Sequence, residues 1–502
     1  MVIRSEPEKR LASDTHITIQ STQEELDQKY QEDLLAKLLA EHGSTWDSPR
    51  DPRDPYNWSS ARKMTVAIIV SLGQLVTIMT TSIIAPSLST IAKDLNMGSS
   101  EMQITFSIFV LGLAFAPFLI AALSEMYGRK GVWIFCNAWY IIWNSVCPVG
   151  HSKALMVIGR FMAGSGASVG VTLTSSVLTD MYRAEHRGKS LAIATFFPYL
   201  GPAIGPILGG VISQNLRWEW SFWILSLFEA AITLIGIFFF TECYTPTLLR
   251  RKALAQQNDA LLLRHSPWGI KFYKDLFSQL KPHILRPIQL MVNRPVVQVV
   301  SFIIALNFGI YCLMLSTYAS LWIDRYNESE TISSLNYIAL AIGTTIATQA
   351  GGPTMDSIYR KLREKNKGET SPEFRAPFLV PGVILAPVGL FWYGWSAEKA
   401  TSWVLVNAGA VVYTCGSFIL AQGMLAYLLD EVDHAASANA AGRMLSNICG
   451  FAFPIFAPRM YDKLGYGWGN SLLAFVFIIL GVPTPFLLWI WGSKLRALGK
   501  KL

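Results

Sequence analysis

The sequence is poor in charged residues. Asp, Glu, Lys and Arg make up 15% of its 502 residues, whereas apolar residues reach 52%. Typical soluble proteins carry about 25% charged residues. Because a water-soluble chain of this length needs more charge to cover its surface, the composition excludes an ordinary soluble multidomain protein and favours a protein embedded in lipid.

Cysteine and histidine are scarce and scattered. The six Cys form no Cys-x-x-Cys pair, so we expect neither a disulfide framework nor a zinc site. None of the seven His lies well inside an apolar run, which disfavours a metal enzyme in the membrane. A Gly-rich phosphate loop of the Walker type is also absent, so direct use of ATP is not expected. The sequence therefore predicts no cofactor, no metal and no enzymatic activity.

Long apolar runs are what the chain has instead. A membrane-crossing helix needs about 20 mostly apolar residues, and twelve runs meet this need. They cover residues 64–88, 102–122, 131–149, 154–177, 190–213, 219–241, 296–320, 333–352, 377–394, 402–427, 436–457 and 470–492. We expect an all-α membrane protein with two six-helix bundles, 61–241 and 296–492, a tail over 1–60, a central loop over 242–295 and a tail over 493–502.

Lys and Arg indicate how the chain is oriented. With a cytoplasmic N-terminus, and counting the tail from residue 50 onward, the inside segments hold 28 Lys and Arg and the outside loops hold 7, which supports both termini inside. The net charge of +8 then follows from topology and not from nucleic-acid binding. We expect the plasma membrane, with the vacuolar membrane as the alternative. The inside segment 428–435 carries Asp430, Glu431 and Asp433 without Lys or Arg, which this rule leaves unexplained.

A short pattern repeats in the two halves, in the loops after the second and eighth runs. In each copy an acid precedes an Arg-Lys pair by four residues: Glu125, Gly128, Arg129 and Lys130 in the first, and Asp356, Arg360 and Lys361 in the second. The glycine permits a tight turn, and the charges can bridge neighbouring helix ends. The pattern predicts a cytoplasmic latch on one conformation. The alternative is an ordinary basic loop of the inner face.

Charged residues also lie inside or just after the runs. Arg160 lies about six residues into the fourth run, where a charge costs ~2.5 kcal/mol or more at the bilayer centre. It should face a cavity or a partner, or else extend to the headgroups. Glu229, near the middle of the sixth run, suits proton exchange, with a neutral hydrogen-bonded Glu as the alternative. Asp180, Arg183 and Arg187 indicate a cytoplasmic gate or a solvated charge cluster.

The fifth run has an unusual spacing of glycine and proline. The residues concerned are Gly201, Pro202, Gly205, Pro206, Gly209 and Gly210. Glycines four residues apart share one helix face and permit close backbone approach, while proline removes helix hydrogen bonds. The pattern predicts a bent, closely packed helix at a moving interface.

Polar residues in the second half are candidate substrate contacts. They are Asn307, Tyr311, Gln349, Arg443 and Asn447. The first two lie one turn apart and could line an aromatic pocket for a flat apolar molecule, although membrane helices also use amides simply to join one another. Asn327, in the outside loop after the seventh run, opens an Asn-x-Ser sequon and is the expected N-glycosylation site.

Together these motifs resemble the major facilitator superfamily, and within it the twelve-span drug:proton antiporters of filamentous fungi. The resemblance extends from about residue 54 to the end of the chain. It implies that the Glu125–Lys130 segment is a conformational latch, that Arg160 takes part in proton coupling, and that the Gly201–Gly210 segment is the antiporter motif. Met126 departs from the general latch pattern, which has arginine there.

We therefore expect a monomeric secondary transporter that exports a small organic compound, such as a secondary metabolite, toxin or drug, in exchange for protons. It would work by alternating access, with membrane lipid as its surroundings. The alternative on the same fold is a polyamine or nutrient transporter that works by uniport or proton symport. A membrane enzyme and a transporter-like receptor without flux are the alternatives from other classes.

Overall fold

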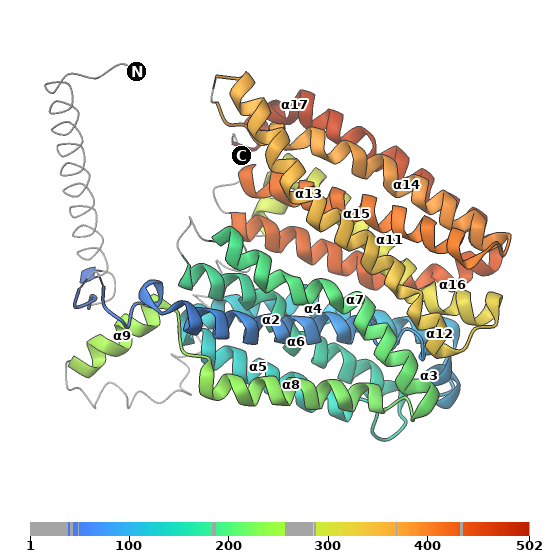
Figure 1. Ribbon diagram of the computed structural model, residues 1–502, viewed down its shortest axis with the longest axis horizontal. Helices are drawn as coiled ribbons and strands as arrows, with labels where there is room; N and C mark the ends of the chain where they lie inside the picture. Colours follow the sequence, from blue (N-terminus) through green and yellow to red (C-terminus); the bar gives the residue numbers. More distant parts are fainter. Residues whose placement is uncertain are drawn as a thin grey trace, which may run out of the picture.

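The computed structural model describes residues 39–40, 44–48, 50–182, 187–256, 285, 288–367, 369–431 and 435–500. Long helices dominate these residues, which contain no β-strand. The first six long helices are α2 (Ser60–Ser82), α4 (Ser99–Tyr127), α5 (Arg129–Val146), α6 (Lys153–Met181), α7 (Arg187–Asn215) and α8 (Trp220–Phe239). They form one bundle, blue to green in Figure 1.

The second bundle, yellow to red in Figure 1, repeats this arrangement. It contains α11 (Pro295–Tyr326), α13 (Tyr337–Lys365), α14 (Ala376–Glu398), α15 (Trp403–Glu431), α16 (Ala435–Gly481) and α17 (Pro483–Lys500). Gly465 interrupts α16 with φ 70° and ψ 176°, so the eleventh span ends there and the twelfth comprises the rest of α16 with α17. The expected all-α fold of twelve spans in two bundles is confirmed.

Short helices connect or flank the spans. They are η1 (Pro55–Asn57), α3 (Leu88–Asp94), α9 (Thr245–Gln256), α12 (Glu330–Leu335) and η4 (Pro372–Arg375).

Eight segments of the described chain are long and apolar enough to cross a membrane, and one of them, Asn439–Leu498, includes both crossings around Gly465. Their outer faces carry exposed apolar side chains: Leu227 is 64% exposed, Phe238 72% and Ile479 69%. Soluble proteins rarely expose so much apolar surface. Three further long helices, α5, α7 and α13, are not among these eight segments.

Several helices extend beyond the apolar runs. The eighth span was expected over 333–352, but α13 runs to Lys365, because a helix continues past the bilayer wherever nothing breaks it. The first span was expected over 64–88, but α2 ends at Ser82. The chain then turns through the segment that contains Pro86, a residue that disfavours helix in the position before it.

The two bundles are joined by hydrogen bonds at one end of the molecule. The Thr90 hydroxyl donates to a Glu330 carboxylate oxygen at 2.7 Å, and the backbone N–H of Thr331 donates to Gln214 Oε1 at 3.1 Å. In Figure 1 this end carries α3 and α12 and lies opposite α9. Nearer the middle, Asn447 Nδ2 of α16 donates to the Leu113 carbonyl of α4 at 3.0 Å.

Candidate functional site

A cavity of about 220 Å³ lies between α11, α15 and α16. Its apolar lining comes from Ile304, Phe308, Tyr311, Phe418, Ala421, Leu425, Leu428 and Gly442, and its polar lining from Asn307, Ser417, Asn439, Arg443, Ser446 and Asn447. We call this the α11/α15/α16 cavity. Most of its wall is apolar, as in typical small-molecule sites, with a few polar groups that can fix orientation.

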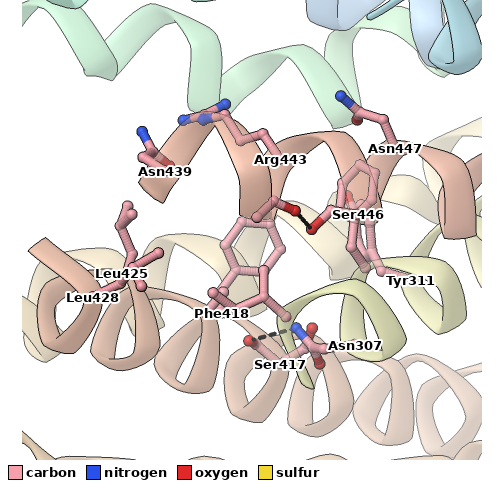
Figure 2. Close-up of a pocket in the computed structure, with 14 residues that line it drawn as sticks. Asn307, Tyr311, Ser417, Phe418, Leu425, Leu428, Asn439, Arg443, Ser446 and Asn447 are labelled. Atoms are coloured by element: carbon pink, nitrogen blue, oxygen red, sulfur yellow. Dashed lines mark hydrogen bonds between the residues drawn. The ribbon is translucent and has the colours of Figure 1, made fainter. Parts of the chain in front are cut away.

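Four of the five expected substrate contacts line this cavity. Asn307, Tyr311, Arg443 and Asn447 do, whereas Gln349 is exposed on α13 and is not among the lining residues. Figure 2 shows Asn439, Arg443 and Asn447 extending from α16 away from the floor formed by α11 and α15. The structure thus brings together side chains separated by more than a hundred positions in the chain.

The floor of the cavity is aromatic. The rings of Tyr311 and Phe418 meet edge to face with centroids 5.5 Å apart, and Phe308 lies 6.3 Å from Tyr311. Below them, Asn307 Nδ2 donates to the Ser417 carbonyl at 3.1 Å (Figure 2). Asn307 Oδ1 and the Tyr311 hydroxyl are buried without a hydrogen-bond partner in the described part of the chain.

Arg160 is fully buried in the first bundle. Its guanidinium donates to the backbone carbonyls of Thr80, Thr105 and Phe106 at 3.1–3.3 Å, and the Phe109 ring lies 4.9 Å away. Its partners are therefore carbonyls of α2 and α4. Arg160 joins three helices and does not line the α11/α15/α16 cavity.

Glu229 is also buried, only 2% exposed, on α8. Neither carboxyl oxygen has a hydrogen-bond partner among the described residues. Gly73 of α2 leaves the space beside it: a Cβ there would lie 3.6 Å from Glu229 Oε1 and 3.8 Å from Trp133 Nε1. Because an isolated ionised carboxylate is costly in such surroundings, this group is suited to carrying a proton.

The basic residues after α4 form a compact charged cluster with two acids. Arg129 Nε donates to Asp180 Oδ2 at 2.9 Å, and its guanidinium lies 4.4 Å from the Tyr244 ring centroid. The Glu242 carboxylate accepts from the backbone N–H groups of Arg129 and Lys130, at 2.9 and 3.1 Å. Burial raises the pKa of the Tyr244 hydroxyl, which stays protonated. Glu242 was not among the residues predicted from the sequence to take part in this cluster.

Gly128 makes the cluster possible. It separates α4 from α5 with φ 96°, in a region that favours glycine. A Cβ at this position would collide with the Glu242 carboxylate. The structure thereby leaves the first N–H groups of α5 open to Glu242, an acid at a helix N-terminus where negative charge is favoured.

In the second bundle, a different arginine occupies the corresponding place. Arg375, at the start of α14, donates to Asp430 at 2.9 Å and to Asp356 at 3.3 Å, and it lies 4.4 Å from the Tyr359 ring. Arg360, expected from the repeat, is exposed on α13. Two acids of segment 428–435 thus find their partners elsewhere: Asp430 pairs with Arg375, and Glu431 with Arg496 at 3.3 Å. Asp433 lies outside the described residues.

Two expected gate residues cannot be placed. Arg183 lies outside the described residues, and Arg187 begins α7 but its side chain is not described.

The glycines of α7 share one face, as expected, and that face packs on α2. Added Cβ atoms at Gly201, Gly205 and Gly209 would collide with Ile78, with Met79 and Ser82, and with Ile83 respectively. An added Cβ at Gly210 would instead collide with Glu330 and Ser334 of α12 in the second bundle. α7 contains Pro198, Pro202 and Pro206 within one continuous helix.

Asn327 ends α11 with φ 52° and is exposed. Its modification stays a prediction. On the same end of the molecule, His151 Nδ1 lies 3.0 Å from Asp94, and its Nε2 lies 3.9 Å from Glu219. Arg217 forms an ion pair with this Glu219. Although the three ligand-type side chains lie close enough to surround an ion, the guanidinium already supplies positive charge there.

Comparison with known proteins gives consistent matches. The model of the Major Facilitator Superfamily matches residues 70–454. The chain is 38% identical over 460 residues to "Efflux pump vrtL" of Penicillium aethiopicum, covering 91% of this chain and 90% of that protein. It is 37% identical over 423 residues to "Probable efflux pump mfs2" of Aspergillus flavus, covering 82% and 98%.

The fold also matches a solved structure. The xylose transporter XylE of E. coli, in a partially occluded inward open conformation, superposes with a TM-score of 0.61 at 14% identity, covering 86% of this chain and 98% of that one.

Proposed function

Since the chain belongs to the major facilitator superfamily, we propose that it is a proton-coupled antiporter that exports a small organic compound by alternating access. As a member of this family it is a multi-pass membrane transporter and not an enzyme. The single observation that carries the proposal of proton coupling is Glu229, a buried carboxyl group without a partner among the described residues. Export is supported by relatives whose names describe efflux pumps.

Glu229 and Arg160 divide the proposed coupling between them. Glu229 takes up and releases the proton, because it is the buried group near mid-span whose charge changes on proton exchange. Arg160 fixes α6 against α2 and α4 through three carbonyls. A charged residue buried at this depth is retained where it serves function, and here it would keep these helices in register while the bundle moves.

The charged clusters act as cytoplasmic latches in this proposal. Glu125, Gly128, Arg129, Lys130 and Asp180 belong to the first latch, with Arg183 and Arg187 predicted beside it. Asp356 belongs to the second latch. There Arg375, and not the expected Arg360, is the arginine that binds the acids. Such latches open in each transport cycle, so bonds shared among partly exposed charges suit them.

The α7 motif serves the same movement. Pro202 and Pro206 lie in this helix. Gly201, Gly205 and Gly209 permit α7 to lie close to α2, while Gly210 touches the other bundle. We propose that α7 transmits the motion of the bundles at this contact. Both termini are then cytoplasmic, the α3/α12 end faces outward, and the protein acts as a monomer in the plasma membrane, with the vacuolar membrane as the alternative.

Flux in inside-out vesicles tests the proposal. We expect wild-type vesicles to accumulate hydrophobic dyes and fungal metabolites only while the pH gradient lasts. Glu229→Gln should abolish gradient-driven uptake but retain exchange of labelled for unlabelled dye, because a glutamine of the same shape binds no proton. Arg160→Lys should lower both, since one ammonium cannot reach three carbonyls.

Glu364→Gln, on the exposed end of α13, is the matched control and should transport normally. Uptake that ignores the pH gradient, or that occurs only in right-side-out vesicles, would exclude proton antiport and favour the uniport or symport alternative, which includes polyamine and nutrient uptake.

A further inference from the structure

We infer that Trp133 and Asn137 of α5 and Thr233 of α8 are positioning residues for the proposed proton exchange, and that they donate to the Glu229 carboxylate once its proton has left. This inference rests on the proposed function, because it names the groups that let the proposed proton carrier lose its proton. It is carried by unpartnered polar atoms, by the packing of α5 on α8 and by the charges around Glu229.

Five buried polar atoms of these four residues lack partners. Neither Glu229 oxygen has a hydrogen bond within the described chain, and the same holds for Trp133 Nε1, Asn137 Nδ2 and Thr233 Oγ1. All four residues are buried, and Thr233, at 6% exposed, is the most accessible of them. Polar groups this deeply buried are normally hydrogen-bonded. A carboxylate accepts and the other three atoms donate, so they can complete one another if they lie together.

Two contacts fix how α5 lies against α8. Near one end, Asn144 Nδ2 donates to the Phe222 carbonyl at 2.8 Å and to Ser226 Oγ at 2.9 Å. At the other end, the Trp133 ring lies against Gly236, where an added Cβ would collide with it. The early residues of α5 thus meet the late residues of α8. The two helices are antiparallel neighbours, and Figure 1 shows them side by side in the first bundle.

Asn137 and Glu229 both fall between these two contacts, on facing helices. Asn137 follows Trp133 by four residues and Thr233 follows Glu229 by four, so each pair shares a helix face. A Cβ added to Gly73 of α2 would lie 3.6 Å from Glu229 Oε1 and 3.8 Å from Trp133 Nε1. The carboxyl and the indole N–H therefore border the same point on α2. The register and this contact bring the donors to the acid.

The helices around Glu229 bring no cation to it. α2 has no charged residue from Val66 to Ser82, α5 has none from Gly131 to Val146, and α7 has none from Leu200 to Asn215. Glu229 is the one charged residue of α8. An ionised Glu229 thus has no ion pair on the described helices that pack on α8.

The other titratable groups at this depth are engaged elsewhere or donate weakly. The Arg160 guanidinium of α6 binds three backbone carbonyls and lies 5.9 Å from the ring of Phe222, two turns of α8 before the carboxyl. The Tyr140 hydroxyl lies 2.7 Å from Thr80 Oγ1, and the thiol of Cys136 is a weak donor. Hydrogen bonds to the charged form of a carboxyl group favour that form, so neutral donors take the place of a counterion.

The step itself moves one proton. The neutral Glu229 carboxyl releases its proton to the water of whichever side is open in the proposed cycle. The carboxylate then accepts hydrogen bonds from the Trp133 indole, the Asn137 amide and the Thr233 hydroxyl, which keep their own protons. Uptake of a proton reverses the step and frees the three donors.

Infrared titration of the full-length protein in lipid nanodiscs tests this inference without transport. The C=O band of the protonated Glu229 carboxyl, identified by its loss in Glu229→Gln, is followed as the pH rises. We expect Thr233→Val and Asn137→Leu each to move the midpoint of this band to higher pH by about one unit, a tenfold change in proton affinity, because the ionised form loses a donor. Trp133→Phe should act in the same direction. Thr233→Ser keeps the hydroxyl and should titrate like the wild type.

The second bundle offers matched controls. Thr414 and Trp322 are also fully buried. The Thr414 hydroxyl donates to the Ala410 carbonyl of its own helix at 2.8 Å, and Trp322 Nε1 has no partner in the described chain. Thr414→Val and Trp322→Phe make the same chemical changes far from Glu229 and should leave the midpoint where it is in the wild type. Thermal unfolding of each sample shows that the variant is folded.

Three results would overturn the inference: an unmoved midpoint in folded Thr233→Val and Asn137→Leu, an equal shift in the two control variants, or a Glu229 band that persists at every pH. The proposed function fails separately. Shifted midpoints in a protein whose flux ignores the pH gradient would refute proton antiport and leave the donor set standing, whereas gradient-driven flux with unmoved midpoints would do the reverse.

Discussion

Arg375 connects the ends of three helices in the second bundle. Its side chain is 15% exposed and bonds Asp430 of α15 and Asp356 of α13 from the start of α14. Because Asp356 is 74% exposed, its pair contributes little, and the Asp430 pair is the stronger of the two. We expect Arg375→Gln to lower the free energy of unfolding by about 1–2 kcal/mol and to slow transport.

Thermal unfolding of the purified protein in detergent, together with flux in vesicles, measures both effects. Arg360→Gln is the matched control, because it removes the same charge from the same face without an ion pair among the described residues. The reverse outcome, with Arg360→Gln damaging and Arg375→Gln harmless, would mean that the sequence repeat identifies the latch better than the contacts do.

The difference between these two arginines shows where sequence reasoning ends at this scale. The motif around Arg129 was predicted, and Arg129 does bind an acid, Asp180. Arg360, which has the corresponding position in the second copy of the motif, is exposed and forms no ion pair among the described residues. In the first bundle Gly128 ends α4, whereas the equivalent position is Tyr359, which lets α13 continue to Lys365. The pattern of charges repeats, but the turn that positions them does not.

Among the elements, α7 depends most closely on its small residues. Gly209 lies against the backbone carbonyl of Ile83, the residue that follows α2, and a Cβ would collide with this oxygen. A backbone atom cannot move aside as a flexible side chain can. We expect Gly209→Ala to separate α7 from α2, to lower the free energy of unfolding by about 1–3 kcal/mol and to abolish most transport.

Gly352→Ala is the control within another long helix, because no atom lies within 4 Å of the added Cβ. It should leave transport unchanged and stability equal or slightly higher, since alanine favours helix over glycine. Equal behaviour of the two variants would contradict a packing role for the α7 glycines.

Apolar runs predicted the positions of the spans well, because the length of a membrane-crossing helix is fixed by the bilayer. They could not predict the partner of a helix face. The glycines of α7 were expected at a moving interface, yet Gly201, Gly205 and Gly209 pack within their own bundle and only Gly210 reaches the other. Sequence periodicity identifies a face, whereas tertiary packing decides what covers it.

For the whole molecule, the candidate site comes from the association of distant segments. The residues of the α11/α15/α16 cavity stand between positions 304 and 447, and their polar members could be proposed individually from the sequence. The sequence could not predict which of these residues lie together, because an exposed Gln349 and a cavity-lining Asn307 look alike in a run of apolar residues. The sequence likewise did not predict the end of the molecule at which the two bundles are joined through α3, α7 and α12, which we call the closed end.

That closed end gives the last prediction. The backbone N–H of Thr331 donates to Gln214 Oε1 at 3.1 Å, and its hydroxyl donates to the Gly210 carbonyl at 3.3 Å, so α12 of one bundle contacts the end of α7 in the other.

If transport requires the bundles to separate here, a covalent link between them must stop the cycle. We expect the double variant Gln214→Cys with Thr331→Cys to lose flux on mild oxidation and to recover it fully with a reductant. Each single Cys variant, oxidised in the same way, should keep its flux, which excludes an effect of the native thiols. Flux that persists in the cross-linked protein, with the bond confirmed by mass spectrometry, would show that this contact stays closed throughout transport and would place the moving interface elsewhere.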